Sequence, residues 1–180
     1  MIRRASPDDV DGVAAVHANA WQAAYHGILP ASTLQAFTVE NRRKFWSGIG
    51  LGDAASERPV LVAVDDDSVI GFAVCGPPRD ADMPFDAELY VLNVDFGHWR
   101  RGVGRSLFAH CVAHLSTTGP ACLYLWVLAA NDPARRFYES LGGNPLIDRI
   151  RDADFDGIGV PELPYVWEKL PIVTVGDRAN

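Results

Sequence analysis

Apolar residues recur along this chain with two different periods, which divide it into predicted helices and strands. Helical spacing of apolar positions is found in residues 6–25, 39–51, 103–116 and 133–141. Alternating or continuous runs of β-forming residues predict strands at residues 2–5, 60–64, 69–75, 87–95, 121–128, 146–151 and 165–170. This order, β-α-α-β-β-β-α-β-α-β-β, predicts an α/β protein in which a mixed sheet carries helices on both faces.

Residues that favour turns and helix ends lie between these segments. Ser6, Pro7 and Asp9 have the spacing of a capping box, which places the start of the first helix there. Asp132, which is followed by a proline, is a suitable N-cap for the last helix. Residues 65–68 separate two β-forming runs and predict a hairpin.

The most informative segment is residues 91–107, V-L-N-V-D-F-G-H-W-R-R-G-V-G-R-S-L, where a strand, a polar turn and a helix follow one another. The turn contains Gly102 and Gly104. Three arginines flank the glycines: Arg100, Arg101 and Arg105. A helix N-terminus presents unpaired N–H groups and partial positive charge, and glycine lets a phosphate come close to that backbone. The segment therefore predicts a cradle for a pyrophosphate. The alternative is that the glycines only let a helix and a strand pack closely.

Two other kinds of nucleotide site are not supported by this segment. A dinucleotide fingerprint needs a third glycine where this chain has Leu107, and no acidic residue closes a following strand at the expected distance. The sequence also lacks G-x-x-x-x-G-K-[ST], which excludes a P-loop for nucleoside triphosphates.

The composition is that of a soluble globular protein. Of the 180 residues, 48% are hydrophobic and 22% are charged, and no apolar run reaches the ~18 residues that a membrane helix needs. We expect one domain, residues 1–172, followed by a flexible tail, residues 173–180. Because the first twenty residues contain three aspartates and no apolar core, no signal peptide is expected, and the predicted location is the cytoplasm.

The distribution of charge along the chain says more about possible partners than the overall composition does. The net charge of −7 argues against nucleic acid as a partner. Positive charge gathers at the glycine turn, whereas aspartates gather in residues 65–67, 80–86 and 148–156. A basic pocket on an acidic body favours an anionic cofactor and a cationic acceptor. The alternative is that the acidic loops only keep the protein soluble.

The three cysteines, Cys75, Cys111 and Cys122, show no metal-ligand spacing. Each lies in an apolar run, which is typical of a small buried hydrophobic side chain. We therefore expect no metal and no cysteine nucleophile.

Residues 88–143 resemble the core of the GNAT N-acetyltransferase superfamily. In that family the motif [Q/R]-x-x-G-x-[G/A] binds the pyrophosphate of acetyl-CoA through backbone amides, and residues 99–104 here are W-R-R-G-V-G. Residues 125–142, L-W-V-L-A-A-N-D-P-A-R-R-F-Y-E-S-L-G, resemble the second cofactor motif of the family. Residues 20–30, A-W-Q-A-A-Y-H-G-I-L-P, resemble its first helix and loop. The resemblance implies a GNAT fold: a mostly antiparallel sheet of six to seven strands, about four helices and a central parallel pair that splays apart.

The sequence departs from the family pattern at two places. Trp99 stands where relatives have Gln or Arg, and Val94-Asp95-Phe96 stands where the preceding strand of relatives usually ends in V-x-P. A cradle made of backbone N–H groups depends on neither side chain.

The resemblance assigns cofactor-binding positions along the strand, the turn and the last helix. Amides of the strand before the turn would bind the pantetheine arm, and one would also face the thioester oxygen. The implied set is Leu92, Val94, Trp99, Arg100, Arg101, Gly102, Val103, Gly104, Arg105, Ser106, Asn131 and Tyr138. For Asn131 the alternative is a turn residue before a helix.

By resemblance, Tyr138 is the general acid that protonates the departing CoA thiolate. A phenol with a pKa near 10 suits a thiolate of similar basicity. The alternative is that Tyr138, like the adjacent Phe137, is an aromatic core residue.

Glu88 is the candidate general base. On its strand we expect Glu88, Tyr90, Leu92 and Val94 to share one face. A partly desolvated carboxylate there could accept the ammonium proton directly or through water. Two alternatives remain: an exposed carboxylate at the start of a strand, and proton removal by water with no dedicated base.

The acceptor pocket is predicted between the first helix and the acidic loop before Glu88. Its candidate residues are Trp21, Tyr25, His26 and Asp86. For Trp21 a core position at helical spacing is the favoured alternative.

These observations predict a metal-independent N-acetyltransferase that moves the acetyl group of acetyl-CoA directly to a primary amine, as a monomer or a homodimer. The alternative is a catalytically silent acyl-CoA-binding sensor or regulatory module. A nicotinamide-dependent oxidoreductase would need a dinucleotide signal that the sequence lacks.

Overall fold

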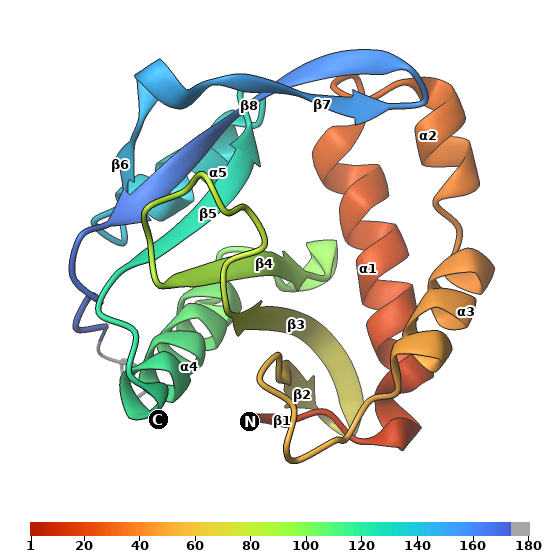
Figure 1. The fold of residues 1–180 in the computed structure, drawn as a ribbon. Helices are drawn as coiled ribbons and strands as arrows, with labels where there is room; N and C mark the ends of the chain where they lie inside the picture. The colour runs from red at the N-terminus through yellow and green to blue at the C-terminus, as the bar shows by residue number, and fades with distance from the viewer. Residues whose placement is uncertain (174–180) are drawn as a thin grey trace.

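A single mixed sheet forms the centre of the molecule in the computed structural model, which describes residues 1–173 (Figure 1). Within those residues the sheet has eight strands in the order β1-β2-β3-β4-β5-β8-β6, and β7 also pairs with β8. The strands are β1 (Ile2–Arg4), β2 (Val60–Asp65), β3 (Ser68–Gly76), β4 (Ala87–Val94), β5 (Leu123–Leu128), β6 (Asn144–Pro145), β7 (Arg151–Phe155) and β8 (Ile158–Trp167). Among these described strands, only β4 and β5 run parallel. The predicted mixed, mostly antiparallel sheet with a central parallel pair is therefore confirmed.

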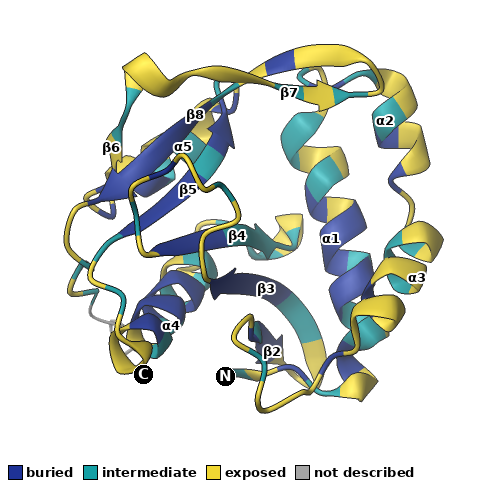
Figure 2. Ribbon diagram, in the orientation of Figure 1, coloured by how far each residue is buried: buried dark blue, intermediate teal, exposed yellow. Residues whose placement is uncertain are grey.

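Helices cover both faces of this sheet. They are α1 (Val10–Tyr25), α2 (Ala31–Ala36), α3 (Val39–Ile49), α4 (Val103–Thr118) and α5 (Asp132–Glu139), with short 3-10 turns at Pro7–Asp9, Phe96–His98 and Ile147–Arg149. One core joins α1 and α3 to β2 and β3, and another joins α4 and α5 to the other face of the sheet. Figure 2 shows the buried surfaces of α1 and α4 turned toward the sheet. The site described below lies where these two layers meet at β4.

The predicted capping box is present, but it caps the 3-10 turn Pro7–Asp9 that leads into α1 rather than α1 itself. The Asp9 carboxylate accepts hydrogen bonds from Ser6 N at 2.6 Å and from the Ser6 hydroxyl at 3.0 Å. It also pairs with Arg3 of β1 at 2.6 Å, and this guanidinium is the main reason that the pKa of Asp9 falls to about 2. The first strand and the first helix are thereby joined.

The C-terminal strands differ from the prediction. Residues 146–151, predicted as a strand, contain the 3-10 turn Ile147–Arg149, in which Ile147 is 73% exposed. The strand predicted at residues 165–170 is β8, which begins at Ile158 and contains two prolines. Proline normally argues against a central strand, so the sequence pattern hid the first half of β8.

Other differences are small. The six residues of α2 were not predicted, because a helix this short carries too little periodic pattern. The predicted tail, residues 173–180, lies outside the described residues except for Val173, which packs against the core. In the described part of the chain, no helix has the length and apolar character needed to span a bilayer.

Candidate acetyl-CoA and amine site

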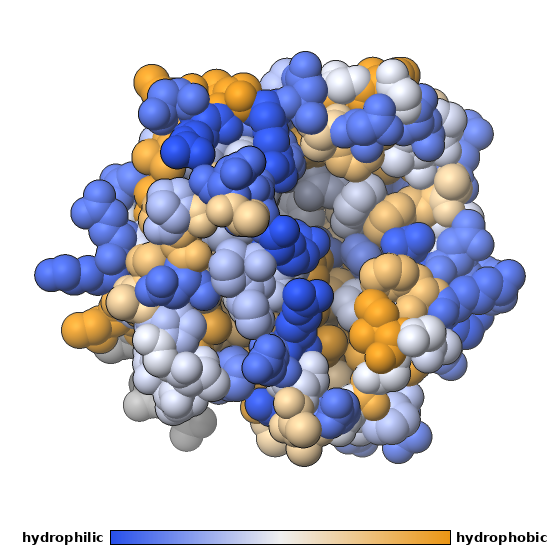
Figure 3. Space-filling model, viewed as in Figure 1, coloured by the Kyte–Doolittle hydropathy of each residue, from blue (hydrophilic) through white to orange (hydrophobic). Residues whose placement is uncertain are grey.

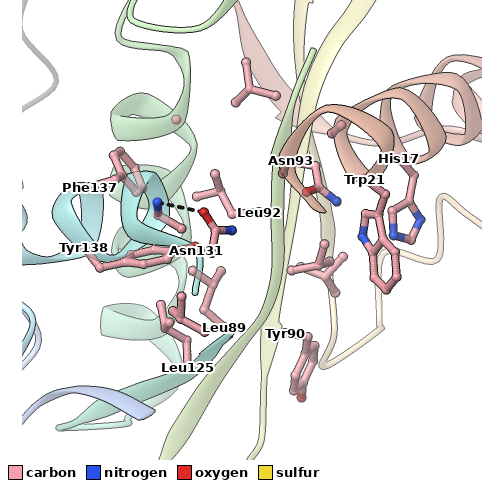
Figure 4. A pocket seen from close by; sticks show the side chains of 18 of the residues that line it. His17, Trp21, Leu89, Tyr90, Leu92, Asn93, Leu125, Asn131, Phe137 and Tyr138 are labelled. Atoms are coloured by element: carbon pink, nitrogen blue, oxygen red, sulfur yellow. Dashed lines mark hydrogen bonds between the residues drawn. The ribbon is translucent and has the colours of Figure 1, made fainter. Parts of the chain in front are cut away.

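A cavity of about 1050 Å³ runs along both sides of β4. Residues of α1, α3, β4, β5, the start of α4 and α5 line it. The surface is hollowed between the sheet and α1 (Figure 3), and Figure 4 shows side chains entering the cavity from both sides of β4. The cavity therefore connects the face covered by α4 and α5 with the face covered by α1 and α3.

The cavity passes between two strands that separate. The parallel pair β4 and β5 is joined only at Ala87–Leu123 and Glu88–Tyr124. Asp95 N, just past the end of β4, donates to Ile70 O at 2.9 Å and so points toward β3. Because successive N–H groups of a strand point to opposite edges, those of Leu92 and Val94 point to the edge that β5 has left. The structure thus brings the two predicted amides to an open strand edge.

A β-bulge in β4 changes which side chains share a face. Cys75 of β3 pairs with Leu89 and the preceding Val74 pairs with Val91, so Tyr90 is the extra residue. Leu89 and Leu92 then lie on the α5 side of β4, whereas Tyr90 lies on the α1 side (Figure 4). The prediction that residues 88, 90, 92 and 94 share one face is therefore wrong, because the bulge shifts the alternation by one residue.

Gly102 and Gly104 are required for different reasons. Gly102 has φ +81° at the N-cap of α4, and a Cβ built there would meet no atom within 4 Å. A Cβ at Gly104 would come within 3.2 Å of Phe137 and 3.6 Å of Leu92. The proposed close packing of helix and strand thus applies to Gly104, whereas Gly102 provides a left-handed turn beside open space.

The start of α4 has the features of an anion site. Its first hydrogen bond runs from Ser106 N to Gly102 O at 3.0 Å, so the N–H groups of residues 103–105 have no acceptor within the helix. Three guanidinium groups line the cavity near this turn: Arg100, Arg105 and Arg136. Unpaired N–H groups, the helix dipole and three cations together favour a bound polyanion.

Not all of the residues predicted to bind the cofactor at this turn face the cavity. Arg101 and Ser106 are not among the residues that line the cavity. The Trp99 ring nitrogen donates to Val94 O at 2.7 Å, which fastens the turn to the end of β4. Arg136 was not singled out from the sequence, although the run A-R-R-F-Y places it two residues before Tyr138.

Asn131 caps a helix and also faces the cavity. Its Oδ1 accepts a hydrogen bond from Ala134 N at 3.2 Å and so caps α5. Its side-chain nitrogen is turned into the cavity, toward β4 (Figure 4). The residue is buried, which makes this nitrogen a fixed donor for a ligand in the gap.

Tyr138 lines the same side of the cavity and is buried. Burial raises the pKa of its phenol well above the usual value, with smaller contributions from Tyr25 and Cys111. Within residues 1–173 its hydroxyl has no protein hydrogen-bond partner, so a protonated donor is available to a ligand. Phe137 beside it packs against Gly104, so each aromatic of the pair has its own role.

Glu88 lies in a different environment from the one predicted. Its carboxylate is 2% exposed and accepts from Arg79 N at 2.8 Å, from the Arg79 guanidinium at 2.5 Å and from the Tyr124 hydroxyl at 3.0 Å. It borders a small polar hollow beside Asp80 and does not line the main cavity. Its carboxylate oxygens are occupied by donors of the protein and do not face the main cavity, and this geometry favours a structural role.

The predicted acceptor residues separate into two groups. Trp21 and Tyr25 line the α1 side of the cavity, and Trp21 also stacks on Phe37 at 3.8 Å, so its packing role and its place in the pocket coexist. His26 is exposed at the end of α1 and lies outside the cavity. Asp86 is also outside it, because its carboxylate binds Ala121 N at 2.9 Å between the starts of β4 and β5.

On the α1 side the cavity is also lined by His17, a weaker candidate for the acceptor pocket from the sequence, and by Trp46 and Asn93, which were not singled out. Trp46 Nε1 donates to His17 Nδ1 at 3.1 Å. Burial lowers the pKa of His17 to about 3, so this imidazole is neutral. For Asn93 a signal existed, because it is a polar residue inside the apolar run V-L-N-V.

Comparison with known proteins agrees with this geometry. Residues 20–143 match the model of the acetyltransferase (GNAT) family. This chain belongs to the GNAT acetyltransferase family. The uncharacterized N-acetyltransferase YuaI of Bacillus subtilis (strain 168) is 29% identical over 172 residues, which cover 94% of this chain and 93% of YuaI.

Solved structures of GNAT proteins share the fold. A ribosomal-protein-alanine N-acetyltransferase from Brucella melitensis superposes with a TM-score of 0.70 at 21% identity, covering 93% of this chain and 98% of that one. The yncA protein of Salmonella typhimurium, solved with its cofactor acetyl-CoA, gives a TM-score of 0.69 at 18% identity over 99% and 98% of the two chains. The resemblance to GNAT proteins and the fold that it implies are confirmed. GNAT proteins use acetyl-CoA, and this chain is accordingly an acetyltransferase by family.

Proposed function

We propose that this GNAT protein transfers the acetyl group of acetyl-CoA directly to a primary amine. The observation that carries the proposal is the continuity of the open edge of β4 with the start of α4. The amide groups of a pantetheine arm can replace the missing strand pairing beside Leu92 and Val94, and the pyrophosphate then meets the unpaired N–H groups of residues 103–105. The cavity continues through the sheet to the α1 side, where the amine would enter.

An N–H group of β4 would stabilise the transition state. When the amine nitrogen attacks the thioester carbonyl carbon, the carbonyl oxygen gains negative charge. The N–H groups of Leu92 and Val94 point into the gap and one of them would donate to this oxygen. Removal of one such donor typically raises the activation free energy by about 3 kcal/mol.

Tyr138 would then donate its proton to the leaving thiolate. Collapse of the tetrahedral adduct breaks the C–S bond and forms the amide, and the phenol proton goes to sulfur, giving free CoA. The raised pKa keeps the phenol protonated until that moment. We assign the proton released by the amine to water. None of the described residues that line the cavity carries a carboxylate, burial lowers the pKa of His17 to about 3, and His98 lies in the turn beside Asp95. Solvent returns a proton to Tyr138.

Asn131→Ser is expected to raise the Kd of acetyl-CoA about 10-fold with little change in stability. Serine keeps an oxygen that can cap α5 but lacks the amide nitrogen that is turned into the cavity. Asn131→Ala removes cap and donor together, so it should also lower the free energy of unfolding by about 1 kcal/mol. Calorimetric titration and urea denaturation measure the two effects. Equal Kd values for the serine variant and the wild type would leave Asn131 as a cap only.

Glu88→Gln is expected to lower the free energy of unfolding by about 1–3 kcal/mol and to leave the shape of the pH–rate profile unchanged. The amide of glutamine cannot neutralise Arg79, so stability falls. Glu88 does not line the main cavity, so its loss should not affect proton removal from the amine. Urea denaturation and kcat/KM between pH 6 and pH 10 give the two readouts. Disappearance of the rising limb of the profile in the variant would restore Glu88 as the base.

The proposal is tested by release of free CoA thiol from acetyl-CoA in the presence of a panel of primary amines. The account expects amine-dependent thiol release, with acetylated amine detected by mass spectrometry in equal amount. Tight binding of acetyl-CoA with no turnover on any amine would favour the alternative, a regulatory module that senses acyl-CoA.

A further inference from the structure

The α1 side of the cavity offers hydrogen-bond donors and no anion. None of the described residues that line the cavity is an aspartate or a glutamate. A cationic acceptor was expected from the aspartates of residues 80–86, which precede β4, but none of them lines the cavity. An acceptor with a second ammonium group, such as a polyamine, would find no carboxylate there to balance it.

Two arginines lie over the same aromatic ring at this end of the cavity. The guanidinium carbons of Arg58 and Arg79 are 5.5 Å and 4.5 Å from the centre of the Tyr90 ring. Glu88 neutralises Arg79, whereas Arg58 forms no ion pair within residues 1–173. Arg58 is exposed at the edge of the cavity, so it brings one uncompensated positive charge there.

Neutral donors add to this charge. The Asn93 side-chain nitrogen is buried without a hydrogen-bond acceptor, and it lies on the α1 side of β4 near Trp21 (Figure 4). Trp126 Nε1, from β5, is likewise a buried donor without an acceptor. Since His17 accepts at Nδ1 and is neutral, its proton is on Nε2, which is a further donor. Buried donors are normally paired, so this set calls for an acceptor-rich ligand.

The rest of the surface on this side is apolar or aromatic. Its side chains are Trp21, Tyr25, Phe45, Trp46, Ile49, Val60 and Val74. Such walls suit an apolar side chain rather than a polar one.

We propose that the amine acceptor is an α-amino acid with an apolar side chain, whose carboxylate is bound by Arg58 together with donors that line the same cavity. This inference rests on the proposed acetyl transfer and names its substrate class. A carboxylate matches the planar guanidinium and supplies the lone pairs that the donors lack. The nearby positive charge also disfavours the ammonium form of the substrate, so more of the amine is in the neutral form that can attack.

The test uses sets of three amines that differ only at one position. L-Phenylalanine, L-phenylalaninamide and 2-phenylethylamine carry a carboxylate, an amide and a hydrogen on the same carbon, and leucine and methionine give matching sets. Spermidine and a peptide with N-terminal alanine complete the panel, and kcat/KM is measured from CoA release. We expect at least one amino acid to exceed its amide and its simple amine by about 10-fold or more. The amino-acid amide has the least basic amine of each set, so the largest fraction of its amine is neutral. If basicity alone decided the rate, the amide would therefore have the highest kcat/KM.

Arg58→Gln gives the second part of the test. We expect kcat/KM for the preferred amino acid to fall about 10- to 100-fold, and that for the matched simple amine to change less than about twofold. Arg58→Lys should recover part of the loss because it keeps the charge. Lys44→Gln, which removes one positive charge from an exposed position of α3 outside the cavity, is the control.

Three results would overturn the inference. The first is a higher kcat/KM for a simple amine, an amide, spermidine or the peptide than for any amino acid. The second is turnover only with amines outside the amino-acid sets. The third is a loss of kcat/KM for the amino acid in Arg58→Gln that is no larger than the loss in Lys44→Gln. Absence of turnover on every amine is a different failure, because it contradicts the acetyl transfer itself.

Discussion

Tyr138→Phe is expected to lower kcat about 100- to 1000-fold while the Kd of acetyl-CoA stays within about twofold of the wild-type value. The phenol is buried against the cavity and its raised pKa keeps it protonated, so its removal deprives the leaving thiolate of a proton donor. Phenylalanine fills the same space, so the packing around it is preserved. Stopped-flow or steady-state thiol release gives kcat, and calorimetric titration gives the Kd.

Tyr165→Phe is the matched control for this variant. Tyr165 is also buried, but its hydroxyl donates to Glu139 at 2.6 Å and it does not line the cavity. Loss of the Tyr165 hydroxyl should lower the free energy of unfolding and leave kcat almost unchanged. A Tyr138→Phe variant with normal kcat and weakened acetyl-CoA binding would assign Tyr138 to packing and remove it from the chemistry.

Gly102→Ile is expected to raise the Kd of acetyl-CoA at least about 100-fold, which corresponds to about 2.7 kcal/mol. A β-branched residue is strained at φ +81°, and its side chain would occupy the open space in front of the unpaired N–H groups of α4. Calorimetric titration with acetyl-CoA measures the change, and circular dichroism during heating measures the accompanying loss of stability.

Gly119→Ile separates strain from obstruction. Gly119 ends the same helix at φ +107°, also with open space around its Cβ position, but it lies outside the cavity. Both variants should therefore lose a similar 1–2 kcal/mol or so of stability from backbone strain, and only Gly102→Ile should lose affinity. Equal affinities for the two variants would contradict the assignment of the pyrophosphate to this turn.

Local signals were sufficient for the part of the site that would bind the cofactor. The glycine–arginine turn and the start of α4 follow from residues 99–106 alone. The start of α5 was predicted to within one residue, because Asp132 was expected as the N-cap and the structure has Asn131 there. These features depend on capping and on backbone conformation over a few residues, which sequence records directly.

Long-range features could not be predicted in the same way. The bulge at Tyr90 adds one residue to a strand without disturbing its apolar character, so no periodicity reports it. The partner of Glu88 is Arg79 from the loop before β4, and the exposure of that carboxylate could not be judged before the loop was placed. The proposed acceptor side is assembled from α1, α3, β4 and a loop. The charge of its lining therefore depends on tertiary structure, and the acidic runs in the sequence did not predict it.

A crystal structure of the protein with bound CoA tests the central claim most directly. The account predicts pyrophosphate oxygens within hydrogen-bond distance of the N–H groups of residues 103–105, and the pantetheine arm between β4 and β5 beside Leu92 and Val94. CoA bound elsewhere on the protein, or an arm that leaves the gap between these strands empty, would contradict it.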